Sequence, residues 1–350
     1  MTDRDLATLR YPFPEPPPPG GWAEISEGIL WIRLPLPMAL DHVNAYALRD
    51  SDGWTLVDTG LGTERTKSHW RELLGGPLSG LPVRRVIVTH HHPDHVGLAG
   101  WFKSDFDAEV LTTRTAWLFA RMLTLDEQSV PTPETLAFYQ SAGMDSERLT
   151  DRAASRPFNF ADVVAPLPLG YSRLTDGDAL RAGGRKWTVR LGNGHAPDHV
   201  TLWASDGDIV LGGDQLLPSI SPNLGVYPTE PNADPVKDWL ASCRMFLGPA
   251  DNNVLVLPGH KLPYRGLQTR LGQLIRNHEE ALIRLEDFLT EPRTATECFV
   301  TLFKREIRDS EYGLALAEAF AHVLHLWHSG RATRQVRKDG AWLWQTTTPK

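Results

Sequence analysis

The feature that most constrains the fold of this chain is a run of histidine and aspartate directly after a predicted strand. Residues 83–90 (VRRVIVTH) predict a buried strand, and the pattern His90-x-His92-x-Asp94-His95 ends it. His90 and His92 alternate along one extended segment, so both point to one side. Pro93 favours a helix start, and Asp94 and His95 then project from its first turn. Four such side chains in six residues suit two adjacent metal ions better than one.

Three further residues are candidate ligands, each at a predicted strand–loop junction: His195 in GNGHAPDH, Asp214 in VLGGDQ and His260 in VLPGH. The glycines beside them allow tight backbone turns near a crowded site. Imidazole and carboxylate are ligands for zinc, iron(II) or manganese, and no cysteine is positioned to bias that choice. We expect two divalent ions, with Zn²⁺ as the first expectation and Fe²⁺ or Mn²⁺ as alternatives.

The remaining histidines predict supporting roles. His91 lies between two candidate ligands and is expected to point away from them. His199 and its neighbour Asp198 are ambiguous, and we expect His199 to support the ligands from behind. His322, His325 and His328 recur at helical spacing, which we interpret as a solvated or interface face of a helix.

The order of elements predicts a mixed α/β fold. Residues 1–21 are proline-rich and predict an extended arm that packs on the body or stays free. Turn signals at Asp52–Gly53, Gly183–Gly184 and Asp206–Gly207 separate strand-like segments. Residues 114–165 contain helical stretches and little strand signal, so they predict an inserted helical cap. A long amphipathic helix follows from Leu267, and the chain closes with a hairpin around Asp339–Gly340.

Composition excludes several classes. The chain has 350 residues, 41% hydrophobic and 23% charged, as in ordinary globular proteins. Its formal net charge of −7 disfavours a polyanion-binding surface. Two scattered cysteines do not form a disulfide scaffold. Neither a secretory signal nor an apolar run of about 18 residues is evident, so we expect a cytoplasmic protein that does not cross a membrane.

In these motifs the sequence resembles the metallo-β-lactamase-fold hydrolase superfamily. The resemblance rests on five motifs in order: VDTG (57–60), THHHPDH (89–95), GHAPDH (194–199), GGD (212–214) and PGH (258–260). The tail from Gln268 resembles the winged-helix extension of the lactamase-β-like subgroup. The resemblance implies an αββα sandwich over 22–265, with the helical cap 114–165 inserted, and a winged-helix-like domain over 266–350.

The resemblance also implies a ligand set like that of glyoxalase II. His90, His92 and His195 would hold the first metal, Asp94, His95 and His260 the second, and Asp214 would bridge both. An aspartate at the bridging position argues against a true β-lactamase, since many of those use a cysteine at the second metal. Pro93 departs from the family pattern and stiffens the loop without removing a ligand.

This ligand set predicts a hydrolase in which a metal-bridging hydroxide attacks a carbonyl or phosphoryl centre. Asp94 is the candidate catalytic residue, because it could orient the hydroxide or pass a proton to the leaving group. Asp58, which ends its strand in VDTG, would hold a ligand imidazole or the loop.

The substrate is predicted less directly. Trp117 and Tyr139 in the cap, and Asn223 and Tyr227 in the loop after Asp214, are candidate substrate contacts. An apolar roof fits a small-molecule ester, lactone or acyl thioester. The amphipathic helix of the tail must cover its apolar face, so we also expect a packing role or a homodimer.

Two other classes stay open. The same metal chemistry cleaves phosphodiesters, and the run Arg331, Arg334, Arg337 and Lys338 could contact RNA, so a ribonuclease is the alternative. The acidic net charge and the nearly neutral tail disfavour nucleic acid as a partner. A winged-helix binding protein without activity is the third class, and the full ligand set argues against it.

Overall fold

The computed structural model describes residues 9–347, which pack as two compact units. The first is formed by the described residues up to Glu127, by Asn159–Pro222 and by Pro249–Arg270. The second is formed by Gln128–Phe158, by Asn223–Gly248 and by the chain from Leu271 onward. The units therefore alternate along the sequence, whereas the motifs predict consecutive domains.

A seven-stranded sheet is the larger sheet of the first unit, with strand order β1 to β7. Its strands are β1 (Trp22–Ser26), β2 (Ile29–Pro35), β3 (His42–Arg49), β4 (Trp54–Val57), β5 (Val83–Ile87), β6 (Glu109–Thr112) and β7 (Ser172–Arg173). The first four strands are antiparallel neighbours, and β4 to β7 run parallel. The connecting helices are α1 (Glu64–Gly75), α2 (Pro93–Val96), α3 (Ala99–Phe106) and α4 (Arg114–Leu125).

A five-stranded sheet completes the first unit, in the order β12-β11-β10-β9-β8. Its strands are β8 (Ala179–Ala182), β9 (Arg185–Gly192), β10 (His199–Ala204), β11 (Ile209–Gly213) and β12 (Leu255–Pro258). Gly183 and Gly184 have φ of 61° and 67° and join β8 to β9, as a two-residue hairpin turn requires. The predicted turn between these strands is confirmed.

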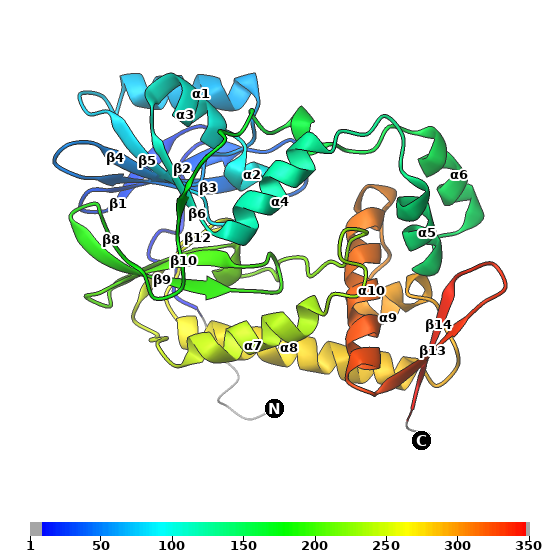
Figure 1. Cartoon of the computed structure of the whole chain (residues 1–350). Coiled ribbons are helices and arrows are strands. Elements are labelled where there is room, and N and C mark those ends of the chain that lie inside the picture. The colour runs from blue at the N-terminus through cyan, green and yellow to red at the C-terminus, as the bar shows by residue number, and fades with distance from the viewer. Residues whose placement is uncertain (1–8, 348–350) are drawn as a thin grey trace. The chain divides into compact units, whose positions relative to one another are not determined.

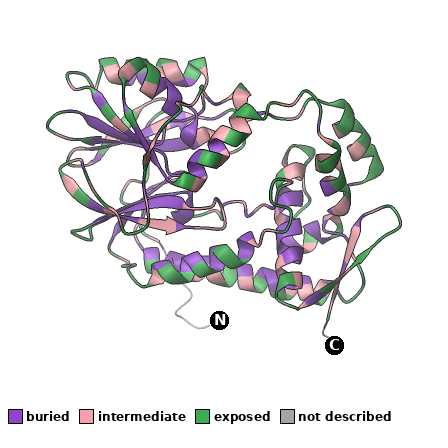
Figure 2. Ribbon diagram, viewed as in Figure 1, coloured by how far each residue is buried: buried purple, intermediate pink, exposed green. Residues whose placement is uncertain are grey.

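Two apolar layers hold the first unit together. Residues of both sheets, among them Trp31, Tyr46 and Trp187, fill the layer between the sheets. The second layer lies between the seven-stranded sheet and its helices, where Trp70 of α1 meets Phe102 of α3 edge to face at 5.1 Å. Figure 1 shows α1 and α3 on the outer side of that sheet, and Figure 2 shows that the strands are largely buried. The predicted mixed α/β class is confirmed.

The proline-rich segment packs on the first unit. Arg10 forms two backbone hydrogen bonds with Arg265, at 3.1 and 2.8 Å. Pro17 is buried, and its carbonyl accepts a hydrogen bond from the Arg33 guanidinium at 3.4 Å. The packed alternative for this arm is therefore correct for the described residues; residues 1–8 lie outside them.

The second unit is mainly helical. Its helices are α5 (Pro133–Ser141), α6 (Ser146–Ala154), α7 (Pro235–Leu247), most of α8 (Leu267–Phe288), α9 (Phe299–Phe303) and α10 (Tyr312–His328). A terminal hairpin of β13 (Ala332–Val336) and β14 (Trp342–Thr346) follows α10, as predicted. Phe320 of α10 packs against Phe138 of α5 and Trp344 of β14, at 5.3 and 6.0 Å between ring centroids. Of the predicted cap 114–165, the segment 128–158 belongs to this unit, and α4 belongs to the first.

Within the described residues, every helix is too short or too polar to span a lipid bilayer.

Candidate metal centre

The segment between β5 and α2 carries most of the candidate ligands. β5 ends at Ile87, three residues before the predicted end of the strand at His90. The chain bends at His90 and His91, and Pro93 begins α2 as the sequence predicts. His90 and His95 are fully buried, whereas His92 is partly exposed. The local geometry therefore brings two histidines from the bend and two side chains from the helix to one place.

Three histidines form the first group of candidate ligands. His92 Nδ1 lies 2.9 Å from His90 Nε2 and 3.1 Å from His195 Nε2. His195 comes from the loop between β9 and β10, so the two sheets together supply this group. Three imidazole nitrogens that converge in this way match the donor set that a borderline divalent ion prefers.

Asp94, His95 and His260 form the second group. His260 Nε2 lies 3.4 Å from Asp94 Oδ2, and His95 Nε2 lies 3.7 Å from the same oxygen. His260 lies two residues after the end of β12, at the strand–loop junction that the motif PGH predicts. The ligand atoms of these three residues, two nitrogens and one carboxylate oxygen, all lie within 4.8 Å of one another.

Asp214 lies between the two groups. Its Oδ2 is 3.2 Å from His260 Nε2 and 3.5 Å from His195 Nε2, and its Oδ1 is 3.5 Å from His95 Nε2. Asp214 Oδ1 and His95 Nε2 are buried and have no hydrogen-bond partner among the described residues. A Cβ at Gly259 would overlap Asp214 Oδ1, so the glycine keeps this space open. Buried metal-binding atoms that face one another without hydrogen-bond partners fit bound cations.

The other ring nitrogens of three histidines are held from behind. His90 Nδ1 lies 3.0 Å from Thr89 Oγ1, His95 Nδ1 lies 2.8 Å from Asp58 Oδ2, and His260 Nδ1 lies 2.7 Å from the His42 carbonyl. Each contact directs Nε2 of its ring to the cluster and leaves that nitrogen free to bind a metal.

Asp58 has a backbone conformation that few aspartates adopt, with φ of 61°. Its carboxylate accepts hydrogen bonds from the Thr89 backbone nitrogen and hydroxyl, both at 2.8 Å, besides its contact with His95. Asp58 therefore holds both a ligand imidazole and the ligand-bearing loop.

His199 and His91 lie beside the ligands. The Asp214 backbone nitrogen donates to His199 Nε2 at 3.1 Å, and the His199 ring stacks on His90 at 4.5 Å. Burial lowers the pKa of His199 to about 3 and that of His91 to about 3, so both rings are neutral at pH 7. His91 packs on Phe119 at 5.1 Å.

The charges of the cluster are strongly coupled. Burial lowers the pKa of His260, but the Asp214 and Asp94 carboxylates outweigh this effect and raise it to about 10. Burial raises the pKa of Asp214, but His260 and His95 hold it well below its usual value. Two carboxylates thus attract protons to the nitrogens that a metal would bind, and a metal must displace those protons.

The candidate substrate contacts lie in different surroundings. Trp117 is buried in the first unit and stacks on Tyr171 at 4.9 Å between ring centroids. The other three belong to the second unit. There Asn223 Nδ2 donates to Glu318 Oε2 at 2.9 Å, the Tyr227 hydroxyl lies 3.4 Å from Asn223 Oδ1, and the Arg152 guanidinium covers the Tyr139 ring at 4.3 Å.

Sequence reasoning missed two residues that orient ligands, Thr89 and His42. Thr89 directly precedes His90, and a hydroxyl next to a candidate ligand is the sequence signal that could have identified it. His42 and His260 are 218 positions apart, and no local pattern connects them.

Comparison with known proteins places this geometry in context. The model of the metallo-beta-lactamase superfamily matches residues 38–292. A second model, described as the metallo-beta-lactamase-like C-terminal domain, matches residues 282–347.

Individual relatives agree with these matches. A protein from Bacillus subtilis named "Probable metallo-hydrolase YqjP" is 26% identical over 306 residues, which cover 85% of this chain and 92% of that protein. The acyl-coenzyme A thioesterase MBLAC2 of Gallus gallus is 24% identical over 247 residues, 67% of this chain and 78% of the other. The crystal structure of a beta-lactamase domain protein from Burkholderia ambifaria has 33% identity and a TM-score of 0.89, covering 97% and 98% of the two chains.

Proposed function

Because this chain belongs to the metallo-β-lactamase superfamily, we propose that it is a two-metal hydrolase that cleaves a carbonyl bond. The substrate classes that fit are an acyl thioester, an ester or a lactone, and the acyl thioester is favoured. The proposal is that His90, His92 and His195 hold one divalent ion, Asp94, His95 and His260 hold the other, and Asp214 contacts both.

The convergence of seven ligand side chains is the observation that carries this proposal. A single ion rarely uses more than four protein ligands in such sites. Asp214 approaches nitrogens of both groups within 3.5 Å, which is the position that a shared carboxylate needs. Zinc suits this set, and the donors alone do not separate zinc from iron(II) or manganese.

Two divalent ions bound here would lower the pKa of a water molecule and polarise the carbonyl oxygen of a substrate. The chain supplies the proton transfer. Burial raises the pKa of Asp94, but the charges of His95 and His260 outweigh it and keep the pKa below its usual value. Asp94 is therefore ionised at pH 7, and its carboxylate can accept a proton and deliver it to the leaving group.

The thioester class is supported by a relative. MBLAC2 of Gallus gallus is an acyl-coenzyme A thioesterase, and it aligns with 67% of this chain. A thiolate is a good leaving group, so a thioester demands less acid catalysis than an amide.

The alternative function is a ribonuclease, and the basic side chains that suggested it do not support it in the structure. Arg331 pairs with Glu286 at 2.5 Å, Arg337 pairs with Asp339 at 2.9 Å, and Arg334 lies over the Trp342 ring at 3.8 Å. Three of the four basic residues of the predicted RNA track thus have partners within the second unit. A phosphate backbone would have to replace these contacts.

A hydrolysis screen tests the proposal. The chain loaded with zinc, iron(II) or manganese is offered an acyl thioester, an ester, a lactone and a single-stranded RNA. We expect cleavage of the thioester and its loss in Asp94→Asn, while the exposed control Asp52→Asn keeps wild-type turnover. RNA cleavage without thioester cleavage would contradict the proposal.

A further inference from the structure

A cavity of about 380 Å³ lies in the first unit beside the candidate metal centre. Its lining residues are Tyr11, Pro16, His42, Ser219, Lys261 and Leu262. The walls are mainly apolar, and Lys261 supplies a positive charge. The cavity has the size range of small-molecule sites, which are typically apolar with a few placed polar groups.

The walls of this cavity are fixed by contacts of their own. Arg10 and Arg265 pair through their backbones and anchor the segment that carries Tyr11. Arg270 is buried and donates to the carbonyls of Leu217 and Ile220, at 2.8 and 2.9 Å, which holds the loop that carries Ser219. The cavity is therefore preformed, and a ligand needs to order little of the chain when it binds.

His42 connects the cavity to the metal ligands. Its carbonyl accepts from His260 Nδ1 at 2.7 Å, and its Nε2 accepts from the Lys261 backbone nitrogen at 3.2 Å. The rings of His42 and His260 lie 6.4 Å apart. A molecule in the cavity thus lies next to a residue that directly holds a metal ligand.

Lys261 itself has two unusual properties. Its φ is 69°, in the left-handed region where a lysine is strained and a glycine is not. Its ammonium forms no ion pair or hydrogen bond with any residue from 9 to 347, and the charge nearest to it in effect is the exposed Asp41 carboxylate, whose pKa it helps to lower. A strained backbone position that holds an unpaired charge at the wall of a cavity indicates that the side chain is kept for a ligand.

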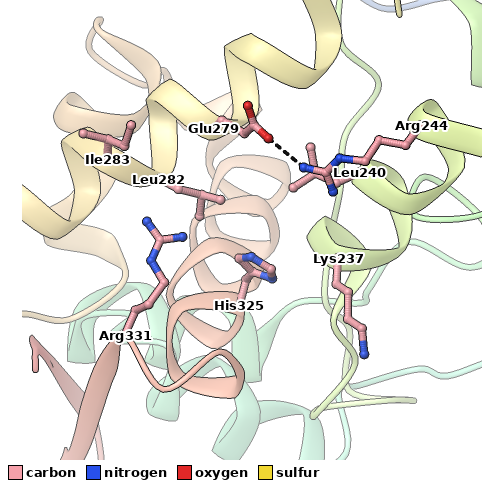
Figure 3. A pocket seen from close by; sticks show the side chains of 8 residues that line it. All are labelled: Lys237, Leu240, Arg244, Glu279, Leu282, Ile283, His325 and Arg331. Atoms are coloured by element: carbon pink, nitrogen blue, oxygen red, sulfur yellow. Dashed lines mark hydrogen bonds and ion pairs between the residues drawn. The ribbon is translucent and has the colours of Figure 1, made fainter. Parts of the chain in front are cut away.

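A cavity in the second unit shows the contrast. It measures about 390 Å³, and Figure 3 shows Lys237, Arg244, His325 and Arg331 among its lining residues. Three of these side chains are already paired: Arg244 with Glu279 at 2.6 Å, His325 with Asp234 at 2.9 Å and Arg331 with Glu286 at 2.5 Å. Internal pairing explains three of these charges without a ligand, and the fourth, Lys237, is an exposed residue of α7.

We propose that Lys261 determines substrate specificity by binding an anionic group, carboxylate or phosphate, of the thiol part of the substrate, while the apolar walls cover the rest of that part. This inference rests on the proposed thioesterase function. The bond that breaks is the one between the acyl carbon and sulfur. Water supplies the hydroxyl of the acid, and the thiol leaves with its anionic group still bound at Lys261.

Kinetics with three thioesters of one acyl group test this proposal. The thiols are N-acetylcysteamine, which is neutral, glutathione, which carries carboxylates, and 4′-phosphopantetheine, which carries a phosphate. We expect the wild type to show a KM for one anionic thioester about threefold to tenfold below that of the neutral one. Which anionic thioester is preferred identifies the group as carboxylate or phosphate.

Variants of Lys261 separate binding from structure. Lys261→Gly should remove the preference by raising the KM of the anionic thioester, with kcat nearly unchanged. Its midpoint of thermal unfolding should stay at or above that of the wild type, because glycine relieves the strained φ. Lys261→Arg should keep the preference. The matched control is Lys304→Gly, an exposed lysine with φ of 57°, which should leave the preference intact.

An unchanged ratio of KM values in Lys261→Gly would overturn the proposal, and so would a changed ratio that comes with a lower midpoint of thermal unfolding. If the wild type cleaves none of the thioesters, the proposed function fails and the cavity is judged by equilibrium binding. Non-cleavable thioether analogues of the three compounds then serve as probes. Lys261→Gly must weaken the binding of the anionic analogues and leave the binding of the neutral analogue unchanged. Equal affinities of Lys261→Gly and wild type for the anionic analogues would contradict the inference.

Discussion

The Asp58 carboxylate contacts His95 on the side of the ring opposite the candidate metal centre, with Asp58 Oδ2 at 2.8 Å from His95 Nδ1. His95 Nε2 faces Asp214 and Asp94 at 3.5 and 3.7 Å. One buried residue thus fixes which nitrogen His95 offers to a metal. The same carboxylate fixes the loop that carries His90, through Thr89.

Replacing this carboxylate should weaken metal binding. In Asp58→Asn the side chain no longer accepts three hydrogen bonds, so His95 and the loop lose their fixed orientation. We expect the metal affinity to fall about tenfold to 100-fold, measured by competition with a chromophoric chelator. Asp52→Asn, an exposed change in the turn before β4, is the control. Equal affinities of Asp58→Asn and wild type would contradict this role of Asp58.

His322 predicts a pH dependence of stability in the second unit. The residue is 1% exposed, its Nδ1 donates to the Glu318 carbonyl at 2.7 Å, and burial lowers its pKa to about 4. Of the predicted solvated or interface face, the solvated alternative is wrong for His322, because its ring stacks on His278 of α8 at 5.6 Å between centroids. Below its ordinary pKa of 6.5 the unfolded chain binds a proton that the folded chain does not.

Stability must then fall as the pH falls from 6.5 towards 4. The free energy of unfolding should drop by about 2 kcal/mol between about pH 7.5 and about pH 5 through this one residue. His322→Asn keeps a donor for the Glu318 carbonyl and lacks the titration. Urea denaturation at both pH values should show a correspondingly smaller drop in the variant. Equal drops in the two proteins would show that His322 does not titrate in this way.

Arg334 is predicted to stabilise the second unit. Its guanidinium lies over Trp342 at 3.8 Å and over Trp327 at 4.4 Å. Arg334→Met should lower the free energy of unfolding by about 1–3 kcal/mol, because two cation–π contacts are lost. The control is Lys338→Met on the exposed turn of the same hairpin. A variant as stable as wild type would show that the stacking contributes nothing.

A test for nucleic-acid binding therefore needs residues other than Arg334, because reversing the charge of Arg334 would disturb the fold. Charge reversal of the exposed Arg337 and Lys338 is suitable. We expect Arg337→Glu with Lys338→Glu to leave hydrolysis of the thioester unchanged in kcat and KM. Cleavage of single-stranded RNA by the wild type that is lost in this double variant would favour the ribonuclease.

Much of the candidate centre follows from the sequence because its signals are local. Four ligands come from six consecutive residues, and Pro93 begins the helix that carries two of them. The hairpin turns follow from glycine in the same way, as Gly183 and Gly184 show. The ligand groups that the motifs imply are the groups that the structure brings within reach of one another.

The residues that were not predictable depend on tertiary contacts. No local sequence pattern around His42 indicates that its carbonyl accepts a hydrogen bond from His260. Likewise, no pattern around Trp117 indicates that its ring stacks on Tyr171. The division of 114–165 between two units also depends on packing, since Phe138 meets Phe320 while α4 packs on the seven-stranded sheet. Helical periodicity indicates which face of a helix is buried, but it does not indicate which element packs against that face.

The metal content of the fully loaded protein tests the central claim most directly. Elemental analysis after removal of loosely bound metal should give two divalent ions per chain for the wild type. Asp214→Ala should give fewer than two and lose most activity while it keeps the circular dichroism spectrum of the wild type, because only the shared carboxylate is missing. A wild type that holds one ion or none, or an Asp214→Ala variant that holds two and keeps its turnover, would contradict the account.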